Sequence, residues 1–265
     1  MILDFINWNV SPNIFSIGPL TVRWYGLLFA STFLIGYIIM KKIFDREHIS
    51  IETLDLLSVY MLAGVIIGAR LGHVIFYQPE YYLKHPLEIL QLWKGGLASH
   101  GAAFGILISL YLFSKKVEKP YIWVLDRIVI VVAVGGFLVR MGNLMNSEIV
   151  GRVTDVPWAF VFVREIPYLG EQARHPSQIY EGLSYIILFA LLMWMYFKKN
   201  LGEKPGLIFG VFLIGLFLSR FIIEFYKDVQ VSFENGMALN MGQLLSIPFI
   251  LFGVYLLVSR LISNK

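Results

Sequence analysis

The chain contains a continuous apolar run, Ile128-Val-Ile-Val-Val-Ala-Val-Gly-Gly-Phe-Leu-Val139, which leads directly into the polar stretch Arg140-Met-Gly-Asn-Leu-Met-Asn-Ser-Glu-Ile-Val-Gly-Arg152. The apolar run is typical of the body of a membrane-spanning helix, which needs about 20 predominantly apolar residues. Two arginines, two asparagines and a glutamate then follow where this helix would reach the membrane interface. An ionisable side chain at that depth has an unfavourable free energy unless it is paired with another group or serves a function. The stretch therefore predicts a membrane helix with a functional polar site at its end.

The composition indicates the same class of protein. Of 265 residues, 57% are apolar and 15% are charged, whereas soluble domains average about 45–50% apolar and about 25% charged residues. Backbone groups in lipid must be satisfied within their own segment, so the apolar spans are expected to be helices. We predict an all-α membrane protein with a single polytopic domain, residues 1–265, and about seven transmembrane helices at 22–41, 53–77, 97–114, 121–141, 178–197, 206–226 and 241–260.

The distribution of Lys and Arg outside the spans predicts the orientation. Eleven of these residues fall on one side and six on the other, and the positive-inside rule puts the richer side in the cytoplasm. With seven spans, the N-terminus lies outside and the C-terminus lies in the cytoplasm. The longer loops then lie outside, and we expect them to form an arm at 78–96 and a head at 142–177, together a small extracytoplasmic cap. Within the head, the alternating stretch Trp158-Ala-Phe-Val-Phe-Val-Arg164 predicts a short strand. The first 21 residues contain no Lys or Arg, so they do not resemble a signal peptide and are predicted as an interfacial segment.

Several kinds of site are not predicted. The chain has no cysteine, which excludes disulfides, thiolate metal sites and a covalent cysteine intermediate on the enzyme. The five histidines are scattered, and no metal motif, nucleophile elbow, phosphate-binding loop or dinucleotide fingerprint is present. We therefore predict no metal and no cofactor. The net charge of +4 is spread over loops and helix ends, so it does not indicate nucleic-acid binding.

Three arginines lie toward the predicted external ends of spans two, four and six: Arg70, Arg140 and Arg220. The forked guanidinium suits bidentate recognition of phosphate, so the three side chains could converge on an anionic lipid headgroup. The alternative is that each long side chain only reaches the interface. Both interpretations stay open for a single arginine, but three at similar depth favour a headgroup.

Two short spacings bring polar residues onto shared helix faces. Arg220 and Glu224 stand four apart, so they are expected to pair, either as a structural ion pair or to orient Arg220 toward a phosphate. Arg140 and Asn143 stand three apart. In the same stretch, Gly142 and Gly151 would let the headgroup approach the backbone closely, whereas Asn143 and Asn146 are also typical of helix ends and turns.

Three other positions are candidates with plain structural alternatives. His100, in Gly95-Gly-Leu-Ala-Ser-His-Gly-Ala102, suits a general base because imidazole titrates at about 6.5, although a lone helical histidine is more often a core residue. The segment His175-Pro-Ser-Gln-Ile-Tyr-Glu181 can orient a headgroup, or can simply cap a helix through Ser177. Tyr25 is either a site residue or a member of the interfacial aromatic belt.

Together these motifs closely resemble the prolipoprotein diacylglyceryl transferase family. The resemblance runs nearly from end to end, and the stretch 140–152 is its most specific part. The stretches that carry it are Arg23-Trp-Tyr-Gly, Gly68-Ala-Arg-Leu-Gly-His, Gly95-Gly-Leu-Ala-Ser-His-Gly, Arg140-x-Gly-Asn-x-x-Asn-x-Glu-x-x-Gly-Arg152, His175-Pro-Ser-Gln-Ile-Tyr-Glu, Ser219-Arg-Phe-x-x-Glu-Phe and Met241-Gly-Gln-x-Leu-Ser-Ile-Pro248.

The resemblance implies a transferase of the bacterial cytoplasmic (inner) membrane with its active site toward the outer leaflet. Such an enzyme moves the diacylglyceryl group of phosphatidylglycerol to the lipobox cysteine thiol of a prolipoprotein and releases glycerol phosphate. The predicted catalytic residues are His100, Arg140 and Arg220, with His100 taking the thiol proton and the arginines stabilising the leaving phosphate. The predicted substrate-binding residues are Tyr25, Arg140, Asn143, Asn146, Glu148, Gly151, Arg220 and Glu224.

Two other functions remain as alternatives. A transporter or channel would place its charges near mid-membrane and show inverted repeats, whereas these charges lie to one side. A lipid-binding scaffold without catalysis is also compatible with the residues alone. The sequence leaves open whether Arg70, His175 and Glu181 act in catalysis or only hold the helices together.

Overall fold

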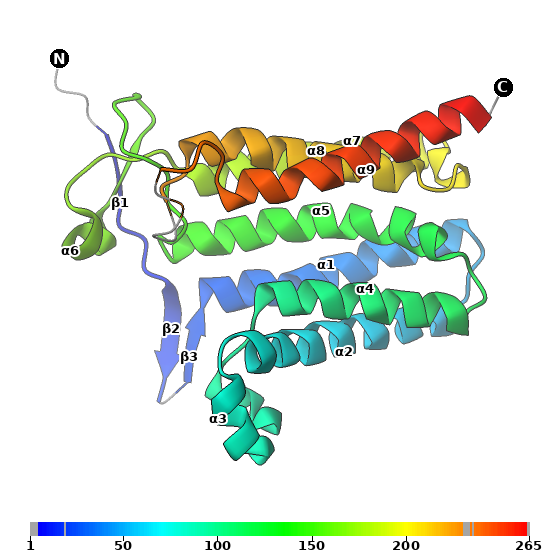
Figure 1. Cartoon of the computed structure of the whole chain (residues 1–265), viewed down its shortest axis with the longest axis horizontal. Coiled ribbons are helices and arrows are strands. Elements are labelled where there is room, and N and C mark those ends of the chain that lie inside the picture. The colour runs from blue at the N-terminus through cyan, green and yellow to red at the C-terminus, as the bar shows by residue number, and fades with distance from the viewer. Residues whose placement is uncertain (1–4, 19, 230–233, 235, 264–265) are drawn as a thin grey trace. The chain divides into compact units, whose positions relative to one another are not determined.

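The computed structural model describes residues 5–18, 20–229, 234 and 236–263, and most of these residues are helical (Figure 1). All seven predicted stretches form helices, although the ends of several differ by a few residues. They are α1 (Trp24–Arg46), α2 (Ile51–Phe76), α4 (Ser99–Lys116), α5 (Tyr121–Met145), α7 (Ser177–Phe197), α8 (Leu207–Ile223) and α9 (Met241–Ser263). The short helical turns between them are α3 (Pro79–Lys84), η1 (Pro86–Leu90), η2 (Leu92–Lys94), η3 (Val163–Glu165), α6 (Ile166–Leu169), η4 (Leu201–Glu203) and η5 (Glu224–Tyr226).

Six helices in the described part of the chain are long and apolar enough to cross a membrane. They are α1, α2, α5, α7, α9 and the continuous segment Leu207–Tyr226 that joins α8 to η5. The protein is therefore a multi-pass membrane protein. The stretch predicted at 97–114 forms the 18-residue helix α4, which begins with Ser99-His100 and ends in two lysines and is not one of the six.

The chain divides into two compact units, one made of Met1–Gly36 with Asp126–Lys265 and the other of Tyr37–Leu125. In the second unit, α2 and α4 lie side by side over most of their length (Figure 1). Their contact is a stripe of glycines at four-residue spacing, where an added Cβ would overlap the backbone of the neighbouring helix. Small residues at this spacing let membrane helices pack closely. The glycines are Gly64, Gly68 and Gly72 on α2 and Gly101 and Gly105 on α4.

The arm predicted at 78–96 belongs to this second unit and consists of α3, η1 and η2. Four large apolar side chains of the arm are more than 70% exposed: Leu83, Leu87, Leu90 and Trp93. The arm is thus a succession of short helical turns rather than an irregular loop.

In the first unit, α5 is the most buried span, with 67% of its apolar window covered against 22–39% for the others. The side of α5 that faces α7 carries Gly136, which lies against the Tyr185 ring. The buried carboxylate of Asp126, near the start of α5, accepts hydrogen bonds from the backbone N–H groups of Gly206 (2.6 Å) and Phe209 (2.8 Å). This carboxylate satisfies the orphan donors at the start of α8 and suits the positive end of its dipole.

The predicted strand in the head is present as β4 (Phe160–Phe162). Its partner was not predicted: β1 (Ile6–Trp8) pairs with it in parallel. The Trp8 indole packs on Phe160 and donates a hydrogen bond to the Leu144 carbonyl oxygen (3.1 Å) at the end of α5. The strand β1 therefore ties the head to the helix that carries Arg140.

The remaining strands form a separate hairpin before α1. β2 (Asn13–Ile17) and β3 (Leu20–Arg23) are antiparallel (Figure 1). The segment predicted as interfacial is thus largely extended, and the exposed side chains of Phe15, Ile17 and Leu20 suit that prediction.

Candidate active site

Arg140 lies in the last turns of α5 and is held by three side chains. Its Nε lies 2.8 Å from Oε2 of Glu181, which is fully buried on α7. Its Nη1 donates to Asn143 Oδ1 (3.1 Å), and it forms a further hydrogen bond with the Tyr185 hydroxyl. Only 13% of the Arg140 side chain is exposed. The guanidinium therefore has a fixed orientation, and most of its donors already have partners.

The loop that follows α5 continues this network. The Asn143 amide donates to Glu148 Oε1 (2.7 Å), and the Asn146 amide donates to the same oxygen (3.3 Å). Ser147 and Ile149 have left-handed backbones, with φ of 56° and 59°. This conformation is unfavourable for residues other than glycine, and it is retained where the surrounding contacts enforce it. The loop turns Glu148 back toward Asn143 and Asn146.

Tyr25, the second residue of α1, lies beside this network. A Cβ on Gly142 would be 2.8 Å from the Tyr25 ring, so the glycine makes room for the tyrosine. Tyr25 also lies within electrostatic range of Glu148 and Arg140. Gly142 therefore permits the close approach of this aromatic side chain, and its approach to a headgroup stays a prediction.

Gly151 likewise serves backbone packing. Its N–H donates to the His175 carbonyl oxygen (2.9 Å), and it forms an isolated bridge with Lys227. A Cβ at this position would lie 2.7 Å from the Tyr226 carbonyl oxygen and would also overlap His175. Any side chain would push these segments apart, so Gly151 has a structural role, and its headgroup contact stays a prediction.

The expected ion pair between Arg220 and Glu224 does not form among the described residues. Glu224 Oε2 instead lies 3.1 Å from Nζ of Lys227. The helical spacing itself persists, because the Glu224 N–H still donates to the Arg220 carbonyl oxygen. The carboxylate of Glu224 is taken instead by Lys227, three residues farther along the chain.

Lys227 joins the two buried carboxylates. Its Nζ lies 3.0 Å from Glu181 Oε1 and 3.1 Å from Glu224 Oε2, and its side chain is 3% exposed. Glu181 therefore binds Arg140 through one oxygen and Lys227 through the other. Four charged groups from α5, α7 and the end of α8 form one buried network.

Arg220, on α8, is half-buried and close to this network without joining it. It lies within electrostatic range of the Tyr185 hydroxyl, which also hydrogen-bonds with Arg140. Two arginines from different helices thus approach one tyrosine on a third helix. Among the described residues, Arg220 forms no ion pair of its own.

Arg70 has a different use from the other two arginines. All three of its nitrogens donate to backbone carbonyl oxygens of the arm: Nε to Ile89 (2.8 Å), Nη1 to Gly95 (2.6 Å) and Gly96 (3.1 Å), and Nη2 to Glu88. The guanidinium is 3% exposed. These four hydrogen bonds favour the structural alternative for Arg70, in which its donors hold the arm. Its convergence on a headgroup stays a prediction.

His100 is the second residue of α4, in the other compact unit. Its side chain is exposed, and its ring contacts those of Phe76 (5.5 Å between centroids) and Tyr77 (5.7 Å). The backbone N–H of Ala98 donates to Ala69 (2.9 Å), which fixes the start of α4 against α2. The imidazole is therefore accessible and held by aromatic neighbours, as a base for an incoming thiol must be.

His175 lies in an aromatic cluster with Tyr180 and Tyr226. Its Nδ1 is 3.0 Å from the Tyr180 hydroxyl. Burial lowers the pKa of His175 below its usual range, because the charged imidazolium is desolvated. These contacts indicate a structural role for the segment 175–181, apart from its buried Glu181.

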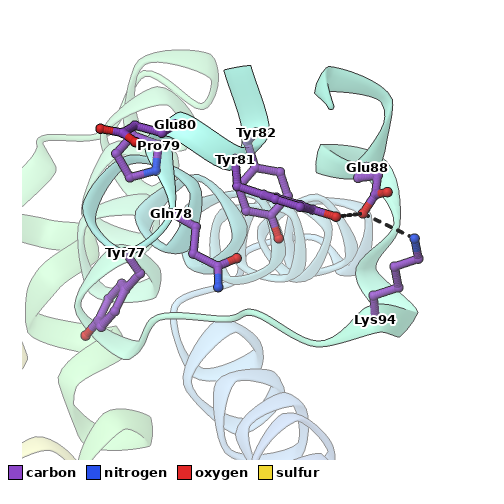
Figure 2. Close-up of a pocket in the computed structure, with 8 residues that line it drawn as sticks. All are labelled: Tyr77, Gln78, Pro79, Glu80, Tyr81, Tyr82, Glu88 and Lys94. Atoms are coloured by element: carbon purple, nitrogen blue, oxygen red, sulfur yellow. Dashed lines mark hydrogen bonds and ion pairs between the residues drawn. The ribbon is translucent and has the colours of Figure 1, made fainter. Parts of the chain in front are cut away.

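A separate cavity of about 710 Å³ lies on the arm and is lined by side chains of 77–82 with Glu88 and Lys94. Figure 2 shows Glu88 between the Tyr81 hydroxyl (2.9 Å) and Lys94 Nζ (3.2 Å). These two contacts lower the pKa of Glu88, and the same carboxylate raises the pKa of Tyr81. The predicted site residues are not among the residues that line this cavity.

Comparison with known proteins identifies the family. The family model described as prolipoprotein diacylglyceryl transferase matches residues 12–259. The chain belongs to the prolipoprotein diacylglyceryl transferase family.

Similar proteins from distant bacteria carry the same name. The chain is 46% identical over 255 residues to a phosphatidylglycerol–prolipoprotein diacylglyceryl transferase of Chloroherpeton thalassium. The aligned residues cover 96% of this chain and 94% of the relative. The chain is 46% identical to the enzyme of that name from Porphyromonas gingivalis (98% and 96% covered). It is 44% identical to the one from Tolumonas auensis (95% and 96% covered).

Two residues of this buried network were missed by the sequence analysis. Tyr185 stands four residues after Glu181 on one face of α7, and that spacing was a usable signal. Lys227 gave no comparable signal, because its position after span six looked like an ordinary interfacial lysine.

Proposed function

We propose that this chain transfers the diacylglyceryl group of phosphatidylglycerol to the lipobox cysteine thiol of a prolipoprotein, forming a thioether and releasing glycerol phosphate. This is the first step of bacterial lipoprotein maturation. The names of the relatives state both substrates. The observation that supports an anionic substrate is the approach of Arg140 and Arg220, from separate helices, to Tyr185.

We assign the phosphate of the lipid to these two arginines. Among the residues that the structure describes, Arg220 has no ion pair, whereas Arg140 is oriented by Glu181 and Asn143. Hydrogen-bond donors fixed before the reaction stabilise developing charge without reorganising. Tyr25, Asn146, Glu148 and Glu224 complete the proposed binding site, and Gly151 supports it through the backbone.

The proposed chemistry needs one base and one anion site. A free thiol has a pKa of about 8.5, so only a small share is thiolate at neutral pH. His100 takes the thiol proton, and the sulfur attacks the glyceryl carbon that carries the phosphate oxygen. The C–S bond forms as the C–O bond breaks, and the electron pair of that bond leaves with glycerol phosphate. The leaving phosphate is held by Arg140 and Arg220, and the proton on His100 passes to solvent.

The proposed setting is the bacterial cytoplasmic (inner) membrane, crossed seven times with α4 as the additional span. The N-terminus, the arm and the head then lie outside, and the site opens toward the outer leaflet. This arrangement is supported by the excess of Lys and Arg on the opposite side. It also matches a secreted substrate, whose cysteine is presented from the membrane.

The activity is tested by incubating the purified protein with phosphatidylglycerol and a lipobox peptide, and weighing the peptide by mass spectrometry. We expect a mass increase equal to one diacylglyceryl group. No increase, together with solute flux across vesicles that contain the protein, would favour a transporter. Lipid binding with neither result would favour a scaffold.

Arg140→Lys is expected to lower the transfer rate about 10²–10³-fold, because a single ammonium replaces neither the forked geometry nor the Glu181 contact. The rate is measured with the same peptide assay. Arg164→Lys, an equivalent change at an exposed position of the head, should leave the rate unchanged. Near-normal activity of Arg140→Lys would contradict the phosphate role.

A further inference from the structure

Lys227 is the most deeply buried cation of the proposed site, and its backbone is fixed independently of its side chain. The Arg152 side chain donates through Nε to the Lys227 carbonyl oxygen (2.9 Å). The Arg152 backbone N–H donates to the Tyr226 carbonyl oxygen (2.8 Å). The bridge with Gly151 holds the same segment from the other direction. The end of the family's most specific stretch therefore positions Lys227.

The carboxylates near Arg220 are taken by other cations. Glu224 contacts Lys227, and Glu181 contacts both Lys227 and Arg140. The carboxyl group of Glu224 also lies against Gly242, where a Cβ would be 2.7 Å from it, in the first turn of α9. The positive end of a helix dipole stabilises a carboxylate there. Glu224 is thus held by two groups other than Arg220.

The charge balance of the network follows from these pairs. The two buried carboxylates, Glu181 and Glu224, form their ion pairs with Arg140 and Lys227. The third carboxylate of the site, Glu148, is exposed and accepts hydrogen bonds from Asn143 and Asn146. Arg220 is the cation without an ion pair among the residues that the structure describes. An unmatched half-buried cation is unfavourable unless an anion binds to it.

Without Lys227, this balance would change. Glu224 would lose its ammonium partner and, four residues after Arg220, could turn back to pair with it. Arg220 would then have a carboxylate partner. Burying Lys227 between two carboxylates offsets the desolvation of all three groups and keeps Glu224 occupied.

We propose that Lys227 is a positioning residue that holds Glu181 and Glu224 away from Arg220, so that the Arg220 guanidinium stays free for an anionic phosphate. The benefit to phosphate binding rests on the function proposed above for Arg220. The ion pairs that Lys227 makes with Glu181 and Glu224 are present in the protein without substrate. Their effect on Arg220 can therefore be measured without any assay of activity.

The direct test is the reaction of arginine side chains with phenylglyoxal in the full-length protein in detergent, followed peptide by peptide by mass spectrometry. In the unmodified sequence, Arg220 should react faster than Arg140, which is paired with Glu181. In Lys227→Met, Arg220 should react several-fold more slowly, because Glu224 pairs with it. Lys227→Arg keeps the charge and should preserve the reactivity of Arg220.

Two further variants separate this effect from a general loss of structure. Lys227→Met combined with Glu224→Gln removes the competing carboxylate, so the reactivity of Arg220 should return. Lys41→Met, the same change at an exposed helical position paired only with Asp45, should alter nothing. Unchanged Arg220 reactivity in a folded Lys227→Met protein would overturn the proposal.

If Lys227→Met does not fold, Glu224→Gln alone decides the question. Its Arg220 should react as in the unmodified sequence, since Lys227 already occupies Glu224; a faster reaction would show that Glu224 neutralises Arg220 and would overturn the proposal.

The consequence for the substrate is measured separately. Lys227→Met should raise KM for phosphatidylglycerol about tenfold, the effect of weakening one charge-assisted contact, and Lys227→Arg should restore it. Slower Arg220 modification with an unchanged KM would uphold the role of Lys227 and would instead overturn the phosphate role proposed for Arg220.

Discussion

Arg140 and Arg220 carry the same charge in different surroundings, and this difference suggests separate roles. Arg140 is engaged by a carboxylate, an amide and a phenol, so its position changes little when substrate arrives. Arg220 has no ion pair within the described part of the chain, so we expect its donors to be available to substrate. We therefore expect Arg220 to supply most of the binding energy for phosphate, and Arg140 to supply a fixed charge beside it.

His100→Gln is expected to lower kcat by about 10²–10⁴-fold, the usual contribution of a general base, while KM for phosphatidylglycerol stays the same. The defect should shrink as pH rises from about 7 to about 9, because the substrate thiol then ionises without help. Rates of peptide modification across this pH range check the prediction. His48→Gln serves as the control, since His48 is exposed and lies outside the proposed site. A defect that does not change with pH would exclude His100 as the base.

Arg70→Met is expected to loosen the arm, because four backbone carbonyls lose a charged donor. Hydrogen bonds to charged groups contribute about 1.5–3 kcal/mol each, so amide exchange in residues 86–96 should accelerate at least about tenfold. Hydrogen-exchange mass spectrometry measures this, with α5 as the internal reference. Exchange that rises equally in α5 would indicate global destabilisation rather than a local role of Arg70.

The glycine stripe between α2 and α4 explains how His100 is presented. Because the two backbones are in contact, the start of α4 cannot slide along α2 without overlap. Glycine packing of this kind contributes close van der Waals contact, which is a main source of helix association in lipid. The element that carries the proposed base is therefore rigid, although the imidazole itself is exposed.

Gly105→Leu is expected to destabilise the protein, because the new side chain would overlap the backbone at Gly64 and Gly68. Overpacking of this kind typically costs about 1–3 kcal/mol. The midpoint of thermal unfolding in detergent should fall for this variant. Ala103→Leu places the same side chain on an exposed face of α4 and should have little effect. Equal midpoints for the two variants would contradict close packing at the stripe.

The elements were predictable to different degrees. Long helices followed from hydropathy alone, since every peptide group in lipid must bond within its own segment. The strand β4 followed from alternation over a few residues. Its partner β1 did not, because three residues near the N-terminus carry little pattern, and their pairing with a segment about 150 residues away is a tertiary contact.

The orientation of the whole protein can be tested because the chain contains no cysteine. Single cysteines at Glu80 in the arm, Tyr168 in the head and Lys119 after α4 are exposed positions for a membrane-impermeant maleimide. In spheroplasts, the first two should be labelled, and Lys119→Cys should be labelled only after the membrane is permeabilised. Labelling of Glu80→Cys and Lys119→Cys from the same side would show that α4 does not cross the membrane.

The sequence by itself determined the class of protein, the helices and the family. These follow from local composition and from one highly specific stretch, 140–152, because the solvation of each segment by lipid depends mainly on its own residues. Most residues that surround the proposed phosphate site, including Arg140, Asn143 and Glu148, were also found this way.

Only the tertiary structure decided which charges pair. It assigned Glu224 to Lys227 rather than to Arg220, committed Arg70 to the arm and brought Tyr185 close to two arginines. In a buried network, side chains from several helices compete for the same partners at distances of about 3 Å. The spacing of residues along a single helix cannot predict the outcome of that competition.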